Sequence, residues 1–142
     1  KDSTPILEFT NGDTDSAMRL RWAASDSNPI AIQTPLPPDL STGAAVELHV
    51  VAAMSGSTDS PALDLDSFFG VGDTKVEDSA TIDGTAVTEY TLTIAAGDVP
   101  SGAMTASFEL TPAAHTTDAL YIYGAWVEYT RTQEARAVET AV

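Results

Sequence analysis

The stretch Ala44-Ala-Val-Glu-Leu-His-Val-Val-Ala-Ala-Met54 decides how the rest of the chain is interpreted. Apolar side chains occupy every second position in it, at Val46, Leu48, Val50 and Ala52. A period of two is typical of a β-strand that buries one face. At about 3.3 Å per residue, the stretch is long enough to cross a sandwich face of roughly 35 Å. The stretch therefore predicts a long central strand.

Shorter segments with the same period recur along the chain, separated by clusters of Gly, Pro, Asp and Ser. We count eight predicted strands, at residues 5–9, 17–24, 29–35, 44–54, 62–71, 88–94, 104–110 and 119–130. Residues 73–84 are interpreted as a polar linker. Many short strands with such separators are typical of an all-β sandwich or barrel. Eight strands with long connections favour an antiparallel jelly roll of two packed sheets over a seven-stranded immunoglobulin-like sandwich.

The chain of 142 residues has the length of one domain. We expect a single jelly-roll β-sandwich over residues 1–130 and a C-terminal tail over residues 131–142. Helix formers gather only at residues 133–141, a stretch too short to be a stable helix by itself. No apolar run approaches the ~20 residues that cross a bilayer. Because the first residue is Lys1, we expect that residues upstream were cleaved, left out or left unseen.

The chain is strongly acidic. Six Lys and Arg residues stand against 21 Asp and Glu residues, which gives a net charge of -15. Such a charge repels nucleic acid and anionic membranes, so we expect neither as a partner. Cysteine is absent, which excludes disulfides and thiolate metal sites.

Catalytic and metal-binding patterns are missing from the sequence. The two histidines, His49 and His115, have no Cys, Glu or His partner at the spacing of a metal site, which favours structural or solvent-exposed roles. The chain has no Gly-x-Ser-x-Gly nucleophile elbow and no phosphate-binding glycine pattern. We therefore predict no catalytic residue, no cofactor and no metal site, and we expect a protein that is not an enzyme.

Two acidic segments leave alternatives open. The segment Asn11-Gly-Asp-Thr-Asp15 resembles the start of a calcium loop but lacks the Gly and the closing Glu of an EF-hand, so a hairpin turn is favoured. Asp64 and Asp66 share one strand face, whereas glycosidases draw their two carboxylates from separate elements around a cleft. A solvated face is the favoured interpretation, and calcium or glycan binding by these segments stays open.

The last predicted strand, Ala119-Leu-Tyr-Ile-Tyr-Gly-Ala-Trp-Val-Glu-Tyr-Thr130, is apolar or aromatic on both faces. Strict alternation places Leu120, Ile122 and Trp126 on one face and Tyr121, Tyr123, Val127 and Tyr129 on the other. A two-layer sandwich buries only one face of a strand, so the second face needs its own cover. We predict a subunit interface there, since Tyr and Trp are enriched at interfaces. Cover by the same chain and an aromatic row that stacks on sugars are the alternatives.

Arg19 and Arg21 alternate with Met18, Leu20 and Trp22, which we expect in the core. The two arginines therefore point out of the sheet together. Within the chain itself, they would pair with Glu and Asp of their own sheet.

Four segments carry a resemblance to a known family. They are the strand with Arg21-Trp22, the connection Pro35-Leu-Pro-Pro-Asp-Leu40, the strand Val46-Glu-Leu-His-Val50, and the closing Leu120-Tyr-Ile-Tyr-x-x-Trp-Val-Glu-Tyr129. Their order resembles small jelly-roll virion structural proteins of tailed bacteriophages. The resemblance implies a homotrimer on the virion surface that acts as a capsid cement or decoration protein and stabilises the shell by binding the major capsid protein.

The predicted trimer interface consists of Arg19, Arg21, Tyr121, Tyr123, Val127 and Tyr129. A closed ring of three such contacts would bury the aromatic face. The resemblance implies that Arg19 and Arg21 then pair with carboxylates of a neighbouring subunit or shell protein, the alternative to pairing within their own sheet. Two other functions stay open at this point: a head or tail fibre module, and a carbohydrate-binding β-sandwich module.

Overall fold

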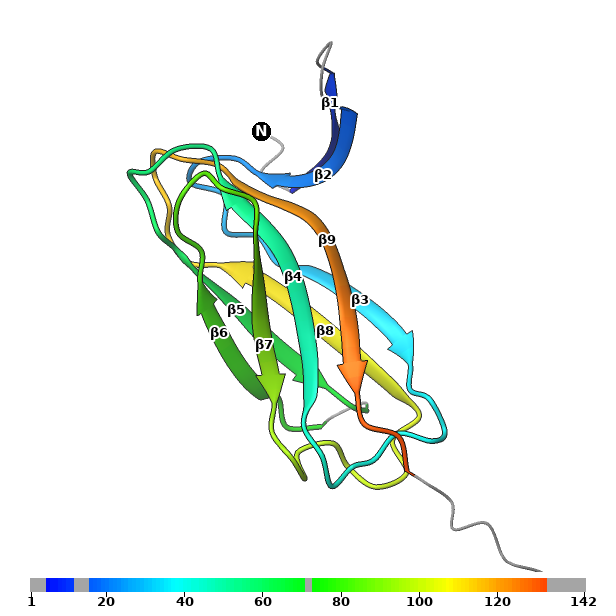
Figure 1. Ribbon diagram of the computed structural model, residues 1–142. Coiled ribbons are helices and arrows are strands. Elements are labelled where there is room, and N and C mark those ends of the chain that lie inside the picture. Colours follow the sequence, from blue (N-terminus) through cyan, green and yellow to red (C-terminus); the bar gives the residue numbers. More distant parts are fainter. Residues whose placement is uncertain (1–4, 12–15, 71–72, 133–142) are drawn as a thin grey trace, which may run out of the picture.

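The computed structural model describes residues 5–11, 16–70 and 73–132 and folds them into two facing antiparallel sheets (Figure 1). One sheet has five strands in the order β1-β2-β9-β4-β7, and the other has four in the order β3-β8-β5-β6. The strands are β1 (Ile6–Asn11), β2 (Ser16–Trp22), β3 (Ile30–Pro35), β4 (Val46–Met54), β5 (Ala62–Phe68), β6 (Val76–Thr81), β7 (Thr88–Ile94), β8 (Thr105–Pro112) and β9 (Leu120–Tyr129).

Strands β2 to β9 have the order of an eight-stranded jelly roll, and β1 is added at the free edge of β2. This confirms the predicted all-β sandwich of two antiparallel sheets. In the described part of the chain, no helix has the length and apolar character needed to cross a membrane.

The core lies between the sheets and is built by the apolar face of each strand. Strand β4 is central, with β7 and β9 on either side, and its alternate residues Val46, Leu48 and Val50 are buried as predicted. Trp22 is the largest fully buried side chain, and its Nε1–H donates a hydrogen bond to the carbonyl of Asn28 at 2.8 Å. That bond removes the cost of burying an unpaired indole N–H.

Strand β6 overturns the prediction of a polar linker across residues 73–84. It pairs with β5 at the edge of the four-stranded sheet, and its residues alternate between half-buried and exposed. An edge strand needs little apolar surface, so the polar composition of β6 made it resemble a linker. Asp78 Oδ2 accepts a hydrogen bond from the backbone N–H of Thr93 in β7 at 2.5 Å, so a carboxylate joins the edges of the two sheets.

The hairpin of β1 and β2 extends beyond the rest of the sandwich (Figure 1). Only Leu20, Arg21 and Trp22 of β2 pair with β9. Met18 is 57% exposed, so its predicted place in the core is wrong, because the second sheet does not reach under this part of the hairpin. The calcium-loop alternative concerns the connection of this hairpin, and residues 12–15 lie outside the described residues.

The end of the described chain is attached to the sandwich. Arg131 forms a β-bridge with Leu40, its Nε lies 2.8 Å from Asp39 Oδ2, and the N–H of Thr132 donates to the carbonyl of Asp39. These contacts hold the proline-rich connection after β3. The rest of the predicted tail, residues 133–142, lies outside the described residues.

Candidate functional site on the outer face of the five-stranded sheet

Strand β9 carries one residue more than its partner β4. In the pairing of these strands, Ala52 lies opposite Ile122 and Val51 lies opposite Gly124, which leaves Tyr123 as the extra residue of a β-bulge. A bulge shifts the alternation of every residue that follows. Our strict alternation for β9 was therefore wrong after residue 123.

The bulge exchanges the faces of the residues beyond it. Trp126, predicted beside Leu120 and Ile122, instead pairs with His49 on the outer face and is 45% exposed. Val127 and Tyr129, predicted on the outer face, pack against the core. Four of the six predicted interface residues come together on the outer face: Arg19, Arg21, Tyr121 and Tyr123. The other two, Val127 and Tyr129, lie on the opposite side of the sheet. The trimer interface itself stays a prediction.

The first half of the outer face is a cluster of arginine and tyrosine. The ring of Tyr121 lies under the guanidinium of Arg19, with 3.6 Å from Cζ to the ring centre, and contacts Tyr123 edge-on at 6.4 Å. Arg19 Nη1 donates to the hydroxyl of Tyr123 at 3.3 Å. The cluster presents flat aromatic surface beside fixed hydrogen-bonding groups.

Glu8 on β1 forms ion pairs with both arginines. Arg19 Nε donates to Glu8 Oε1 at 2.7 Å, and Arg21 Nε donates to Glu8 Oε2 at 2.8 Å. Partial burial lowers the pKa of Arg19, but hydrogen bonds with Tyr123 and Glu8 outweigh that effect and raise it above the ordinary value. The arginines thus pair with a carboxylate of their own sheet, which was one of the two predicted alternatives.

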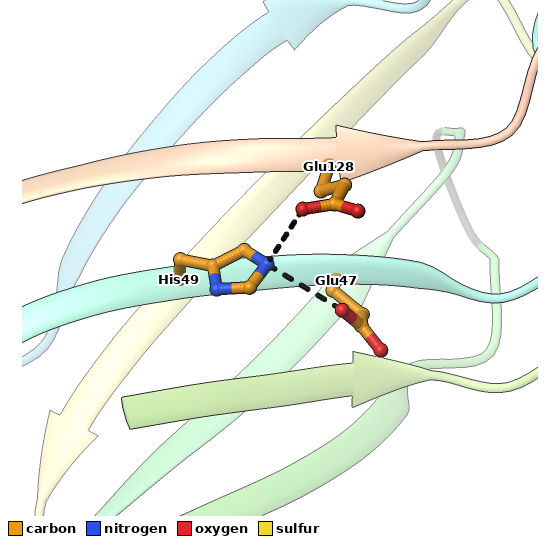
Figure 2. A group of neighbouring side chains, drawn as sticks. All are labelled: Glu47, His49 and Glu128. Carbon is orange, nitrogen blue, oxygen red and sulfur yellow. Dashed lines mark ion pairs between the residues drawn. The ribbon is translucent and has the colours of Figure 1, made fainter. Parts of the chain in front are cut away.

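The second half of the outer face is centred on His49. Its imidazole stacks on the indole of Trp126, with 5.0 Å between ring centres and 1° between ring planes. Nδ1 lies 2.8 Å from Glu89 Oε1, whereas Nε2 lies 3.4 Å from Glu47 Oε2 and 3.5 Å from Glu128 Oε2. Figure 2 shows the carboxylates of Glu47 and Glu128 beside the same ring nitrogen. One histidine thus meets three carboxylates from three adjacent strands.

The spacing of residues along the chain does not predict this cluster, because two of its carboxylates come from other strands. Glu47 precedes His49 by two positions and therefore shares its strand face, which is the one signal that was available. Glu89 and Glu128 come from β7 and β9, and only the pairing of these strands with β4 brings them to His49.

His115 and the acidic pair behave as the sequence predicts. His115 is 1% exposed, and its ring nitrogens lie 2.9 Å from the carbonyl of Ala113 and 3.1 Å from that of Ala23, so it connects two loops.

Asp66 lies on the outer face of the four-stranded sheet and pairs with Lys75 at 3.1 Å. Hydrogen bonds with Glu77 and Asp66 raise the pKa of Lys75. These contacts describe a solvated acidic face.

No protein-family model matches the chain, and no curated protein matches its sequence. Among solved structures, the chain is similar to TmCBM61 in complex with beta-1,4-galactotriose, with a TM-score of 0.54 and 10% identity over 85% of this chain and 74% of that one. It is similar to Family 16 Carbohydrate Binding Module-2, with a TM-score of 0.52 and 10% identity over 87% of this chain and 83% of that one.

A third similar structure is the enzymatically active domain of tailspike protein 4 of bacteriophage CBA120. Its TM-score is 0.50 at 16% identity, over 89% of this chain and 17% of that one. At these identities, all three likenesses concern the fold.

Proposed function

We propose that this protein is a non-catalytic carbohydrate-binding module that holds a glycan against the outer face of its five-stranded sheet. The observation that carries the proposal is the bulge in β9, which collects Tyr121, Tyr123 and Trp126 on one solvent-facing surface. Carbohydrate binding was an alternative in the sequence analysis, and the placement of Trp126 now favours it over the subunit interface.

Trp126 supplies the flat apolar surface of the proposed site. One face of its indole is covered by His49, so the remaining exposed area is held in a fixed orientation. A pyranose ring presents C–H groups on its faces, and these pack on aromatic rings through apolar contact and weak C–H interactions. The rigid stack lowers the entropy that Trp126 loses when a sugar covers it.

Polar groups beside the aromatic rings supply the directional part of recognition. Tyrosine hydroxyls, guanidinium N–H groups and carboxylate oxygens donate to or accept from sugar hydroxyls. Arg19 and Arg21 are held in place by Glu8, so they need little reorganisation on binding. Between the two halves of the face lies Gly124, where an added Cβ would meet no atom within 4 Å, so the surface there is open.

The likeness of the fold to TmCBM61 and to Family 16 Carbohydrate Binding Module-2 supports the proposal at the level of architecture. The absence of a Gly-x-Ser-x-Gly elbow in the sequence agrees with a binding role.

The proposal is tested by native electrophoresis in gels that contain β-1,4-galactan, mixed-linked β-glucan or xylan. We expect retardation by at least one polysaccharide, and Trp126→Ala should abolish it. Phe9→Ala is the matched control, since Phe9 is 62% exposed and lies on the opposite face of the β1–β2 hairpin from Glu8. Migration unaffected by every polysaccharide, or equal retardation of Trp126→Ala and wild type, would refute the proposal.

A second candidate is a structural module of a tailed-phage virion, either the predicted capsid cement protein or a fibre module. The fold-level likeness to a bacteriophage tailspike domain favours it. Light scattering on the purified chain separates the candidates, because the virion proposal expects a trimer. A monomer at micromolar concentration would count against it.

A further inference from the structure

His49 contains a buried nitrogen that has no hydrogen-bond partner. The residue is 8% exposed, and Nε2 is one of two buried side-chain polar atoms without a partner in the described part of the chain. Leaving such an atom unpaired destabilises the folded state, because burial has removed the water that would satisfy it. The position of Nε2 therefore requires an explanation.

Glu89 determines which ring nitrogen carries the proton when the imidazole is neutral. A carboxylate only accepts hydrogen bonds, so the 2.8 Å contact with Glu89 Oε1 requires a proton on Nδ1. The lone pair of Nε2 then points toward Glu47 and Glu128, as Figure 2 shows for the side chains. Three electron-pair donors thus face one another, an arrangement that a cation between them would stabilise.

The distances fit a metal ion better than a hydrogen bond. The two Nε2···O separations are 3.4 and 3.5 Å, whereas N–H···O bonds span about 2.7–3.2 Å. Tetrahedral zinc with ligands at about 2.1 Å places neighbouring ligand atoms about 3.4 Å apart. The ligand atoms of all three residues lie within 4.8 Å of one another, and the two glutamates are exposed enough to adjust around an ion.

No described Lys or Arg neutralises this cluster. Every Lys and Arg side chain of residues 5–11, 16–70 and 73–132 already forms an ion pair with another carboxylate. The pairs are Arg19 and Arg21 with Glu8, Lys75 with Asp66 and Glu77, and Arg131 with Asp39. Glu47, Glu89 and Glu128 are thus left to a single histidine. A divalent cation would supply the missing charge.

We propose that Glu47, His49 and Glu128 form a binding site for a zinc-class divalent cation on the outer face of the five-stranded sheet. His49 Nε2 and one carboxylate oxygen from each glutamate are the ligands. Glu89 orients the imidazole through Nδ1, the usual role of a carboxylate behind a ligating histidine. Three protein ligands leave a fourth position open. Imidazole is a ligand for zinc and other transition metals rather than for calcium, which sets the ligand class.

Isothermal titration of the untagged full chain with zinc chloride at neutral pH tests the site, with calcium chloride in parallel. We expect one zinc ion per chain and no equivalent response to calcium. Glu128→Gln should weaken zinc binding at least tenfold without affecting folding, because the Glu128 side chain is 69% exposed. Glu77→Gln is the matched control, since Glu77 is similarly exposed but lies on the other sheet.

His49→Gln provides the second variant, because it removes the nitrogen ligand and leaves the carboxylates. It should abolish stoichiometric zinc binding. The proposal is overturned if zinc fails to bind the wild type, if His49→Gln binds zinc like the wild type, or if Glu77→Gln weakens binding as much as Glu128→Gln. Zinc alone is the probe, so the result is independent of glycan binding.

Discussion

Deletion of Tyr123 should be tolerated, although this residue lies in the middle of a sheet strand. In a regular strand, removal of one residue moves every following side chain to the other face. In β9, however, Tyr123 is the extra residue of the bulge, so its removal restores regular alternation. Trp126 should stay on the outer face and Val127 against the core.

The expected cost follows from the contacts of Tyr123. The deletion removes the 3.3 Å hydrogen bond from Arg19 and the edge-on contact with Tyr121. A hydrogen bond contributes about 0.5–1.5 kcal/mol and an aromatic pair a similar amount, so the loss of unfolding free energy should be about 1–3 kcal/mol. A typical domain has 5–15 kcal/mol in total, so the variant should remain folded.

Deletion of Ser107 is the matched control. Ser107 lies in β8, which pairs without a bulge on both sides, so its removal turns the buried Phe108 and Leu110 outward. Exposing these two side chains costs roughly 3–6 kcal/mol, and Glu109 would turn into the core at a further cost. This variant should not fold.

Urea denaturation monitored by circular dichroism measures the free energy of unfolding of both variants. Acrylamide quenching of tryptophan fluorescence reports the exposure of Trp126, because Trp22 is fully buried. If deletion of Tyr123 destabilises the protein as much as deletion of Ser107, or if it makes Trp126 inaccessible to acrylamide, the assignment of the bulge is wrong.

Three further predictions concern the contacts that hold the sheet and its loops. Gly56→Ala should cost about 2–4 kcal/mol in urea denaturation, because its Cβ would displace the Asp118 carboxylate from two backbone N–H groups, whereas Gly124→Ala should be close to neutral. Hydrogen bonds from the N–H groups of Asp118 and Thr117 lower the pKa of Asp59, so its stabilisation is present above its unfolded pKa and is lost as pH falls through the folded value. The stability difference between wild type and Asp59→Asn should therefore shrink below about pH 4, and a constant difference between about pH 6 and pH 2 would contradict the assignment. Glu8→Gln should speed hydrogen exchange in β1 without changing β4, and equal rates in β1 before and after the change would show that the arginine pair does not hold this strand.

The two-sheet architecture could be predicted because most strands show the period of two. Strand β7 is an example, since Leu92 and Ile94 are buried and Glu89 and Thr91 lie on the outer face, as alternation predicts. Strand β6 could not be predicted, because an edge strand is stabilised by pairing with one neighbour and contributes little to the core. A polar edge strand and a polar loop have nearly the same composition.

The candidate site was predicted only in part. The placement of Arg19 and Arg21 on the same face follows from alternation, and the structure shows it. The position of Trp126 depends on the bulge, which is a property of two paired strands and has no marker in β9 alone except Gly124. The His49 cluster depends on the register of three strands, so no pattern along the chain contains it.

The proposed glycan site and the proposed metal site can be tested separately because they share only one residue. Trp126 belongs to both, since it offers the exposed ring surface for a sugar and packs on the imidazole that would bind the metal. Glu128 belongs to the metal site, whereas Arg19 and Tyr121 lie in the other half of the face, beyond Gly124. Glu128→Gln should therefore weaken zinc binding and keep polysaccharide retardation, whereas Tyr121→Ser should weaken polysaccharide retardation and keep zinc binding. If both variants lose both properties, the metal would complete the glycan site, and its open coordination position would face the sugar.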